Sequence, residues 1–419
     1  MRSSYLSILR VPHARPLVLA SLLGRLAFAT GPLGLVLFVQ DRTGSLAQAG
    51  LTSAVVALTS GLLAPMRGRL VDRYGQRRCL PPLAAVFATA LVGIVVVARP
   101  GSTGTVVTVG LAAVAGAAAP PIAASMRVLW ISLIGQGPRL QTAYALDAVL
   151  EEVLYVVGPL LAGALAATID PAAGLLTAAG LALAGTFGFV VSPLSWTWSG
   201  SQAGPAGWAG SMASRGMRTL ALTLAGVGAA VGIWEIGVVA AARREGATQA
   251  AAGALLAVWA TASAVGGLWY GARTWRGATG KRFLALLALL ALACAPMAAA
   301  PSLAALAVVI AMVGLVTAPL ESAAFVLAAE LAPPGTMTES ATWVTTAMNV
   351  TAAAGIALAG ALIDRAGVSS TMVIAWACTG AALLVALAGR ASLGAERYRG
   401  KHVARHAGAR QMWRARRIL

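Results

Sequence analysis

The sequence predicts an all-helical integral membrane protein with twelve transmembrane helices, arranged as two six-helix bundles. Of its 419 residues, 59% are hydrophobic and 11% are charged, and the mean hydropathy is +0.82. Soluble domains carry about 25% charged residues, so this chain is too apolar to fold in water. About 20 apolar residues cross a bilayer core, and the chain offers about twelve runs of that length.

The runs are separated by glycine, proline and charged residues, which commonly mark turns. The first run lacks a convincing cleavage site and is too long for a signal-peptide core, so we expect it to remain as a span. We place the spans near residues 16–40, 46–66, 80–98, 104–130, 141–169, 172–194, 218–241, 248–270, 282–300, 302–330, 338–363 and 369–389.

One long, weakly apolar stretch interrupts the runs halfway along the chain. It is rich in Gly, Ser and Pro, a composition typical of a flexible linker. We therefore expect an N-terminal bundle at 1–194, a cytoplasmic linker at 195–217, a C-terminal bundle at 218–389 and a basic cytoplasmic tail at 390–419.

The basic residues predict the orientation of the chain. Of the 31 Lys and Arg residues, 24 fall at the termini and in the breaks that share their side of the membrane. Five fall on the opposite side, and Arg25 and Arg127 lie within spans. Because Lys and Arg accumulate on the cytoplasmic side, we expect a multi-pass protein of the cell membrane with both termini in the cytoplasm.

The break between the second and third spans, GRLVDRYGQRRCL at 68–80, has a more regular pattern of glycine and charged residues than a short loop usually has. Glycine permits close helix approach and tight turns, and an aspartate past a helix end can pair with arginines or with the N–H groups of another helix. The positions that form the pattern are Gly68, Leu70, Asp72, Arg73, Gly75, Arg77 and Arg78.

This pattern resembles the signature loop between helices 2 and 3 of the major facilitator superfamily of secondary transporters. The resemblance implies two six-helix bundles around a central cavity, with alternating access by rocking between them. It also implies that these motif residues act as a conformational switch.

A second copy of the pattern supports two related halves. GALIDRAG at 360–367 repeats GRLVDRYG at 68–75 in its Gly-x-Leu, Asp-Arg and final Gly. The two copies fall on opposite sides of the predicted membrane, as inverted repeats would place them, although chance can also produce one octet. The stretch at 267–282 occupies the equivalent place in the second half but has no Asp.

Ionisable residues within the spans are costly and therefore need partners or a water-filled cavity. Asp147 and Glu151 are four residues apart on one helix face, and Arg127 lies at a comparable depth. We expect Arg127 to pair with Asp147, Glu151 or Glu152. The resemblance implies that Asp72 joins this network, which would close the cytoplasmic side in the outward-facing state. A static cluster needed only for assembly is the alternative.

Proton coupling requires carboxyl groups that load and release protons near neutral pH, and removal from water favours the protonated form. By depth we favour Glu235 and Glu321, followed by Glu151 and Glu152. We expect Arg25 to face Glu235 and Glu321 across the cavity, and Asn349 to line it. Each of these side chains could instead be a satisfied structural polar group.

Two shorter motifs complete the resemblance. Gly158-Pro159, followed by Gly163, partly matches the antiporter motif in helix 5 of drug:proton exchangers, although a packing kink explains it equally well. The resemblance also implies that Asp72 lies near 336–342, at the start of the eleventh span. We expect Glu339 to repel it there.

Several chemistries are not indicated. The sequence contains no phosphate-binding Gly-x4-Gly-Lys-Ser/Thr loop, no His-Glu-x-x-His and no Gly-x-Ser-x-Gly. The three cysteines have unrelated spacings. We expect no enzyme activity, cofactor or metal site. The basic tail would bind anionic lipid rather than nucleic acid because it adjoins the last span. We expect a monomer.

The most specific function that this sequence predicts is proton-coupled efflux of a small amphipathic compound. Asn349 is the only asparagine in the chain, whereas a sugar site would need many Asn and Gln side chains. One alternative is a proton-coupled symporter that takes up a nutrient or metabolite. A second is a membrane sensor that uses the same scaffold without transport.

Overall fold

The computed structural model describes residues 2–98, 102–198, 207, 209–275 and 277–394, and regular structure in these residues is helical. The first half contains α1 (Arg2–Leu9), α2 (Ala14–Thr43), α3 (Leu46–Tyr74), α4 (Gln76–Val97), α5 (Ser102–Ala118), α6 (Ile122–Ile134), α7 (Pro138–Thr168) and α8 (Pro171–Val191). The short α9 (Pro193–Thr197) and the 3-10 helix η1 (Gly210–Ala213) precede the second half. That half contains α10 (Arg215–Arg244), α11 (Gln249–Gly271), α12 (Thr279–Cys294), the 3-10 helix η2 (Ala295–Ala299), α13 (Leu303–Leu331) and α14 (Met337–Ala388).

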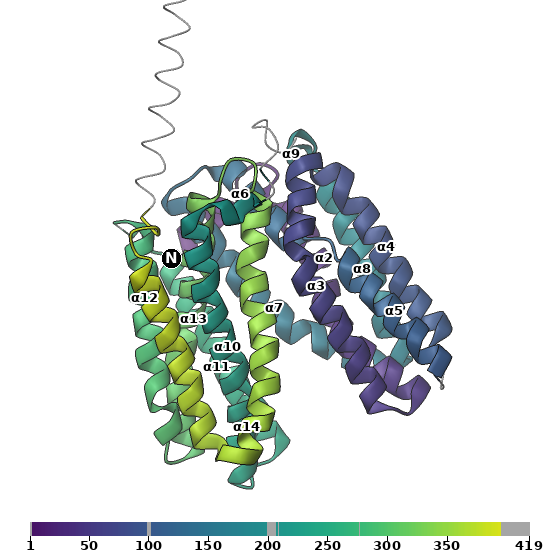
Figure 1. The fold of residues 1–419 in the computed structure, drawn as a ribbon. Coiled ribbons are helices and arrows are strands. Elements are labelled where there is room, and N and C mark those ends of the chain that lie inside the picture. The colour runs from purple at the N-terminus through teal and green to yellow at the C-terminus, as the bar shows by residue number, and fades with distance from the viewer. Residues whose placement is uncertain (1, 99–101, 199–206, 208, 276, 395–419) are drawn as a thin grey trace, which may run out of the picture.

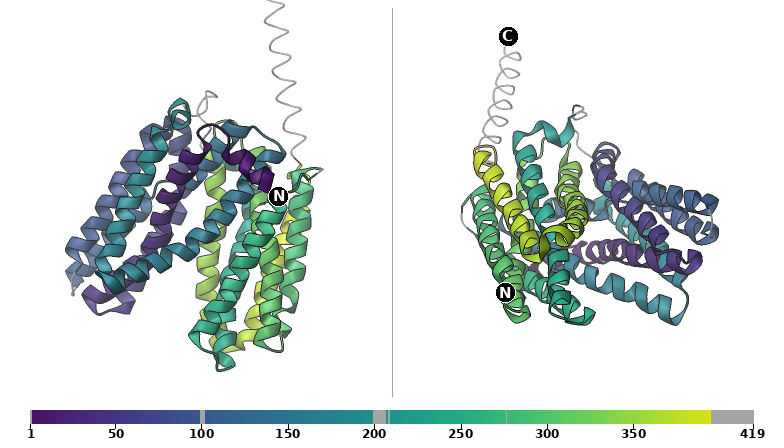
Figure 2. Two further views of the ribbon diagram at one scale, coloured as in Figure 1. Left: turned by 180° about the vertical axis from the view of Figure 1, so that it is seen from behind. Right: turned by 60° about the horizontal axis from the view of Figure 1, so that its bottom comes forward.

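The helices form two bundles that meet at one end and diverge toward the other (Figures 1 and 2). Within the first bundle α2 packs on α8, α3 on α5 and α4 on α8; within the second, α10 packs on α14 and α11 on α13. The bundles touch through α3 against α14, and through α7 against α11 and α13. Helices from both halves therefore meet along a shared interface.

Eleven helices in the described part of the chain are long and apolar enough to cross a membrane. The last of them, α14, has 52 residues, and Gly367 within it has non-helical backbone angles of φ 81° and ψ 171°. At 1.5 Å per residue this helix is about 78 Å long, against a bilayer core of about 30 Å. It therefore supplies two crossings, and the predicted all-helical class and two-bundle fold are confirmed, with a helix count close to twelve.

Close approach of the helices depends on small residues, as is common in membranes. A Cβ atom at Gly228 or Gly232 of α10 would overlap the backbone of α14 at Met348 or Ala352. The same holds for Gly266 of α11, where a Cβ would overlap the α13 backbone at Leu315. Backbone-to-backbone packing of this kind fixes the helix pairs within the second bundle.

The stretch at 68–80 is almost entirely helical, which corrects the expectation of a loop. Helix α3 continues to Tyr74 and α4 begins at Gln76, so Gly75 alone breaks the helix, with φ 89° and ψ 154°. Only glycine adopts this backbone region readily. Gly367, the last residue of the second octet, has nearly the same angles. The repeat is therefore structural as well as sequential.

The described parts of the 195–217 stretch pack on the bundles, with α9 against α4 and α8 of the first half and η1 against α10 and α14 of the second. Ser195 Oγ donates a hydrogen bond to Gln76 Oε1 at 3.0 Å, and the Arg77 guanidinium lies 3.6 Å from the Trp196 ring centroid. Residues 199–206 and 208 lie outside the described residues, as does the tail from 395, where we expected contact with anionic lipid.

We predict that Gly75→Ala and Gly367→Ala each lower the stability of the protein by about 1–3 kcal/mol, because a side chain is strained in this backbone region. Gly180→Ala is the matched control, since Gly180 is helical and a Cβ there would meet nothing within 4 Å. Thermal unfolding of the purified protein in detergent would measure the difference. Equal melting temperatures for the three variants would contradict the assignment.

Candidate functional site

A cavity of about 740 Å³ lies between the two halves. Its walls come from α2, α3, α7 and the α5–α6 break on one side, and from α14 on the other. Most of the lining is alanine, leucine, valine and proline. The charged and polar lining residues are Arg25, Ser60, Arg67, Arg127, Glu151 and Tyr155 from the first half, and Thr342, Thr345, Thr346 and Asn349 from α14. The expectation that Asn349 lines the cavity is confirmed.

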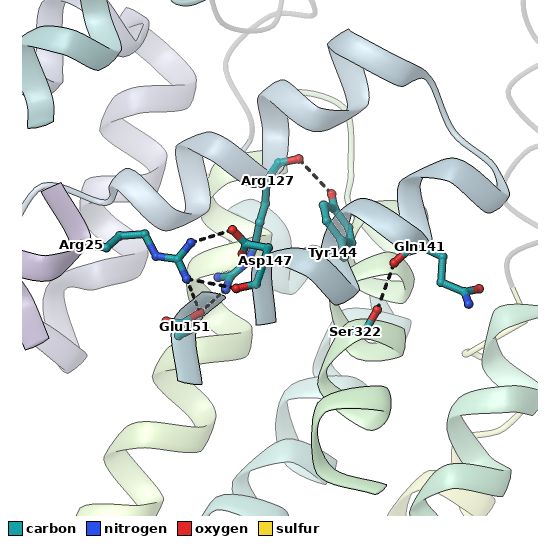
Figure 3. Close-up of polar contacts among 7 residues, drawn as sticks. All are labelled: Arg25, Arg127, Gln141, Tyr144, Asp147, Glu151 and Ser322. Carbon is teal, nitrogen blue, oxygen red and sulfur yellow. Dashed lines mark hydrogen bonds and ion pairs between the residues drawn. The ribbon is translucent and has the colours of Figure 1, made fainter. Parts of the chain in front are cut away.

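Two arginines and two carboxylates form a buried cluster on the cavity wall (Figure 3). Arg25 contacts Asp147 at 2.6 Å and Glu151 at 2.8 Å. Arg127 contacts the same two carboxylates at 2.9 Å and 2.6 Å. Each acid is therefore shared by both arginines, and the cluster joins α2, α6 and α7. The expected pairing of Arg127 with the acids of α7 is confirmed.

The other half of the protein reaches this cluster through an aromatic ring. The Arg127 guanidinium lies 3.7 Å from the centroid of Phe325 on α13, a favourable cation–π geometry. Tyr144 donates its hydroxyl to the Arg127 carbonyl at 3.0 Å. The guanidinium of Arg127 is thus held at its edge by the two acids and on its face by Phe325, while Tyr144 holds its backbone.

The expectation that Arg25 faces Glu235 and Glu321 is wrong, because Arg25 is held by Asp147 and Glu151. Glu321 instead lines a small closed pocket within the second bundle, beside Trp234. Glu235 is half-buried on α10, with no hydrogen-bond or ion-pair partner among the described residues. Glu152 does not join the arginines either and accepts a hydrogen bond from Ser263 at 3.0 Å.

Arg67 is a cavity residue that the sequence reading missed. It is 7% exposed and donates to the carbonyls of Gly116 at 2.9 Å, Ala117 at 3.0 Å and Ser60 at 2.7 Å. The first two carbonyls lie four residues before Pro120 and Pro121, which have no N–H to return the helical hydrogen bond. Arg67 thus supplies the hydrogen-bond donors that these two carbonyls lack at the break between α5 and α6.

Asp72 closes one end of the interface between the halves. Its carboxylate accepts hydrogen bonds from the backbone N–H groups of Thr338 at 2.9 Å and Glu339 at 2.8 Å. These are free N–H groups at the start of α14, where the helix dipole also favours a negative charge. The expectation that Asp72 lies near 336–342 is confirmed. Gly68 permits the approach, since a Cβ there would overlap Thr342 and the Glu339 backbone.

The like charge of Glu339 acts on Asp72, as expected, but it does not prevent Asp72 from binding the start of α14. The buried Glu339 carboxylate accepts two hydrogen bonds from Arg69, at 2.8 Å and 3.1 Å, and further ones from the backbone N–H and hydroxyl of Ser211. Arg69 lies on α3 and Ser211 between the bundles. Asp72 therefore binds the backbone at the start of α14, whereas Glu339, a residue of α14 itself, binds Arg69 and Ser211.

The signature motif divides between two faces of α3 and α4. Gly68, Asp72 and Gly75 occupy the interface or the helix break, whereas Leu70 is 44% exposed and Arg73 lies over Tyr74. The network of Asp72 with Arg127 is not formed, because each has its own partners. The remaining motif arginines are exposed, with Arg77 over Trp196 and Arg78 beside a shallow surface pocket.

Helix α7 carries the second contact between the halves. The Gln141 side chain donates to the Tyr270 carbonyl at 3.3 Å and accepts from Arg282. Its backbone carbonyl accepts from Ser322 at 3.5 Å (Figure 3). Near the N-terminus Tyr5 donates to the Leu268 carbonyl at 2.7 Å. These contacts lie at the same end of the molecule as Asp72, so this end is tightly closed.

The partial antiporter motif is explained by packing. A Cβ at Gly158 would overlap the backbone of Ala29, so glycine permits the contact between α7 and α2. Pro159 lies inside α7, and Gly163 has open space around its Cα. Trp234 and Trp259 pack edge to face within the second bundle at 5.5 Å. The sequence of this motif therefore gives no independent sign of transport direction.

Comparison with known proteins identifies the family. The sequence model of the Major Facilitator Superfamily matches residues 17–339, which is more than half of the chain. The chain belongs to the major facilitator superfamily. A curated relative, the MFS-type transporter y4rN of Sinorhizobium fredii, is 29% identical over 187 residues. That match covers 41% of this chain and 42% of y4rN, so the chain matches about two-fifths of its relative's length.

Solved transporters share the whole fold. An outward-facing bacterial homologue of the iron transporter ferroportin superposes with a TM-score of 0.72 at 16% identity, covering 90% of this chain and 99% of that one. The human organic anion transporter MFSD10 gives 0.71 at 16% identity, with 89% and 98% covered. The outward conformation of the transporter FucP gives 0.67 at 14%, with 91% and 99% covered. At these identities the likeness supports the fold alone. The chain is a multi-pass membrane protein of a secondary transporter family.

We predict that Asp147→Asn destabilises the protein by about 3–5 kcal/mol, because it leaves buried arginine charge unbalanced. Asp41→Asn is the control, since Asp41 meets Arg42 at 3.9 Å with both side chains about half exposed. An exposed pair contributes about 0–1 kcal/mol. Chemical or thermal unfolding in detergent would compare the two, and similar losses would show that the cluster is not structurally important.

Proposed function

We propose that the protein is a proton-coupled exporter of a small amphipathic compound that works by alternating access. The observation that carries this proposal is the cavity between the two halves, closed at one end by contacts that the halves make with each other. Such contacts can break and re-form as the bundles rock, whereas contacts within a bundle persist. The apolar cavity wall suits an amphipathic substrate.

The sidedness of the proposal rests on charge. Because Lys and Arg accumulate on the cytoplasmic side, the end that carries Asp72 and the chain termini would face the cytoplasm. The closed end would then be cytoplasmic and the conformation outward-facing. In this account Asp72, Gly68 and Gly75 form the switch, and Arg25, Arg127, Asp147 and Glu151 hold the moving first half together.

Carboxylates within the spans would carry the protons. We retain Glu235 and Glu321 as the first candidates, because neither is neutralised by an arginine in the described residues. The negative charges of Glu152 and Glu151 also act on the Glu321 carboxyl group. Glu151 lies on the cavity wall itself, so a proton there would loosen its pairs with the two arginines.

The second octet would close the opposite end in the alternate state. Helices α3 and α14 pack against each other in opposite directions. Each follows a Ser or Thr N-cap and carries the Asp of an octet three residues before the glycine that breaks the helix, Gly75 or Gly367. Asp72 follows Ser45 by 27 positions, and Asp364 follows Thr336 by 28. Asp72 now binds the start of α14, whereas Asp364 is exposed. By this symmetry Asp364 would bind the start of α3 after rocking.

We predict that Asp364→Asn retains the protein in the present conformation. The reporter is Ala353→Cys, a cavity position, in a background without the three cysteines. This cysteine should react about two- to fivefold faster with a membrane-impermeant maleimide when Asp364→Asn is present than when it is absent, since a charge at a helix start contributes about 0.3–1 kcal/mol. Asp170→Asn is the control, because Asp170 caps only its own helix. Unchanged labelling in Asp364→Asn would contradict the reverse contact.

Transport itself would be tested in inverted membrane vesicles that carry a proton gradient. A panel of fluorescent cationic, neutral and anionic amphipaths would be offered to wild type, Glu235→Gln and Glu321→Gln. We expect gradient-driven accumulation in wild type and its loss in at least one variant. No accumulation of any compound by well-folded protein would overturn the export proposal in favour of symport, or of a sensor if binding persists without flux.

A further inference from the structure

We propose that the central cavity takes an amphipathic anion, whose acid group binds between Arg67 and the first turn of α6. The inference names the substrate class and rests on the proposed function only in taking this cavity as the transport site. Three separate features of the cavity wall lead to it: its charge, its free hydrogen-bond donors and the helix start that faces it.

The charged groups on the cavity wall do not balance. Arg25 and Arg127 are matched by the two acids of their cluster, which leaves Arg67 with no carboxylate partner in the described chain. The nearby acids do not correct this, because Glu152 is bound to Ser263 and Glu321 lies in the closed pocket of the second bundle. An unpaired cation within the membrane is costly and is commonly part of a substrate pathway.

The arginines also retain unused donors. A guanidinium has five N–H donors in a planar fork. Arg67 is 7% exposed, and its Nε has no acceptor among the described residues. Nη1 of Arg127, a residue that is 2% exposed, has none either. Buried polar atoms are usually hydrogen-bonded, and both residues line the cavity. A small rotation of either guanidinium would therefore offer its free N–H group to an acceptor there.

The helix start adds donors of the same kind. Helix α6 begins after Pro121, which has no side chain to cap it. The N–H groups of Ala123 and Ala124 have no backbone acceptor in the part of the chain that the structure describes, and both residues line the cavity beside Arg67. Free N–H groups and the helix dipole together favour an anion at such a position.

The rest of the cavity suits an apolar body attached to that acid group. Leu58, Leu154 and Val350 line it with many alanines, and its volume of about 740 Å³ is that of a site for a drug-sized molecule. Asn349 stands on the opposite wall with its side chain exposed. A carboxylate or sulfonate on a hydrophobic skeleton therefore fits better than a cation, which would meet an excess of arginine.

The test uses three dansyl-labelled alkyl probes that differ only in the terminal group: a sulfonate, the neutral sulfonamide and an amine. Uptake would be measured in the inverted vesicles described above. We expect the sulfonate to accumulate and Arg67→Gln to reduce its uptake about tenfold or more, because a charge-assisted hydrogen-bonding site is lost. Arg218→Gln, an exposed arginine of α10, should leave it unchanged.

A second variant avoids the risk that Arg67→Gln disturbs the α5–α6 break. Asn349→Asp adds a negative charge at an exposed cavity position, and should lower sulfonate uptake while raising amine uptake. Asn349→Gln, which adds no charge, should alter the uptake of both probes by the same factor and so leave the ratio of sulfonate to amine uptake as in wild type. Accumulation of the amine or sulfonamide but not the sulfonate would overturn the anion inference and leave the export proposal standing. Accumulation of no probe would remove both.

Discussion

The two hydrogen bonds from the start of α14 to the Asp72 carboxylate hold the halves of this protein in their present relation. They are local in origin, since a helix must leave its first N–H groups free and an aspartate at the end of another helix can accept them. Their effect is global because α3 and α14 belong to different bundles. Glu339 and Arg69 strengthen the same junction with an ion pair. The cavity begins directly beyond it, at Thr342.

The buried arginines make a different contribution. A chain with so few charges nevertheless keeps Arg25, Arg127, Asp147 and Glu151 together, where each charge offsets the desolvation cost of another. The cluster ties α2, α6 and α7 into one unit, so the first half can move without coming apart. Arg67 performs the equivalent task at the α5–α6 break by hydrogen-bonding carbonyls that proline leaves free. One rigid half thus presents both a neutral cluster and a net positive charge to the cavity.

The fold class could be predicted because it depends on local signals, and the docking of Asp72 was expected from the family resemblance that its motif carries. Apolar runs of bilayer length and the Gly-Asp-Gly spacing are visible in the sequence. The role of Arg67 could not be predicted in the same way. A basic residue near the end of an apolar run is assigned to the loop, and only the structure shows that its side chain extends back along the helix to the carbonyls of another helix. The partners of Arg25 and Glu339 depend on the crossing of helices far apart in the chain. The depth of a residue in the membrane does not determine which acid an arginine meets. The like-charge repulsion between Asp72 and Glu339 is offset because each acid has its own hydrogen-bond donors.

The most direct test of this account is a measurement of distances across both ends of the interface. Spin labels would be placed at Ala47 and Ala361, near the diverging ends of α3 and α14, and at exposed sites flanking the Asp72 contact, in a background without the three cysteines. Pulsed electron resonance would compare wild type with Asp72→Asn. The account predicts that the variant gains a population in which the Ala47–Ala361 distance shortens while the distance at the Asp72 end lengthens. Identical distance distributions in both proteins would contradict the claim that Asp72 holds the halves in place.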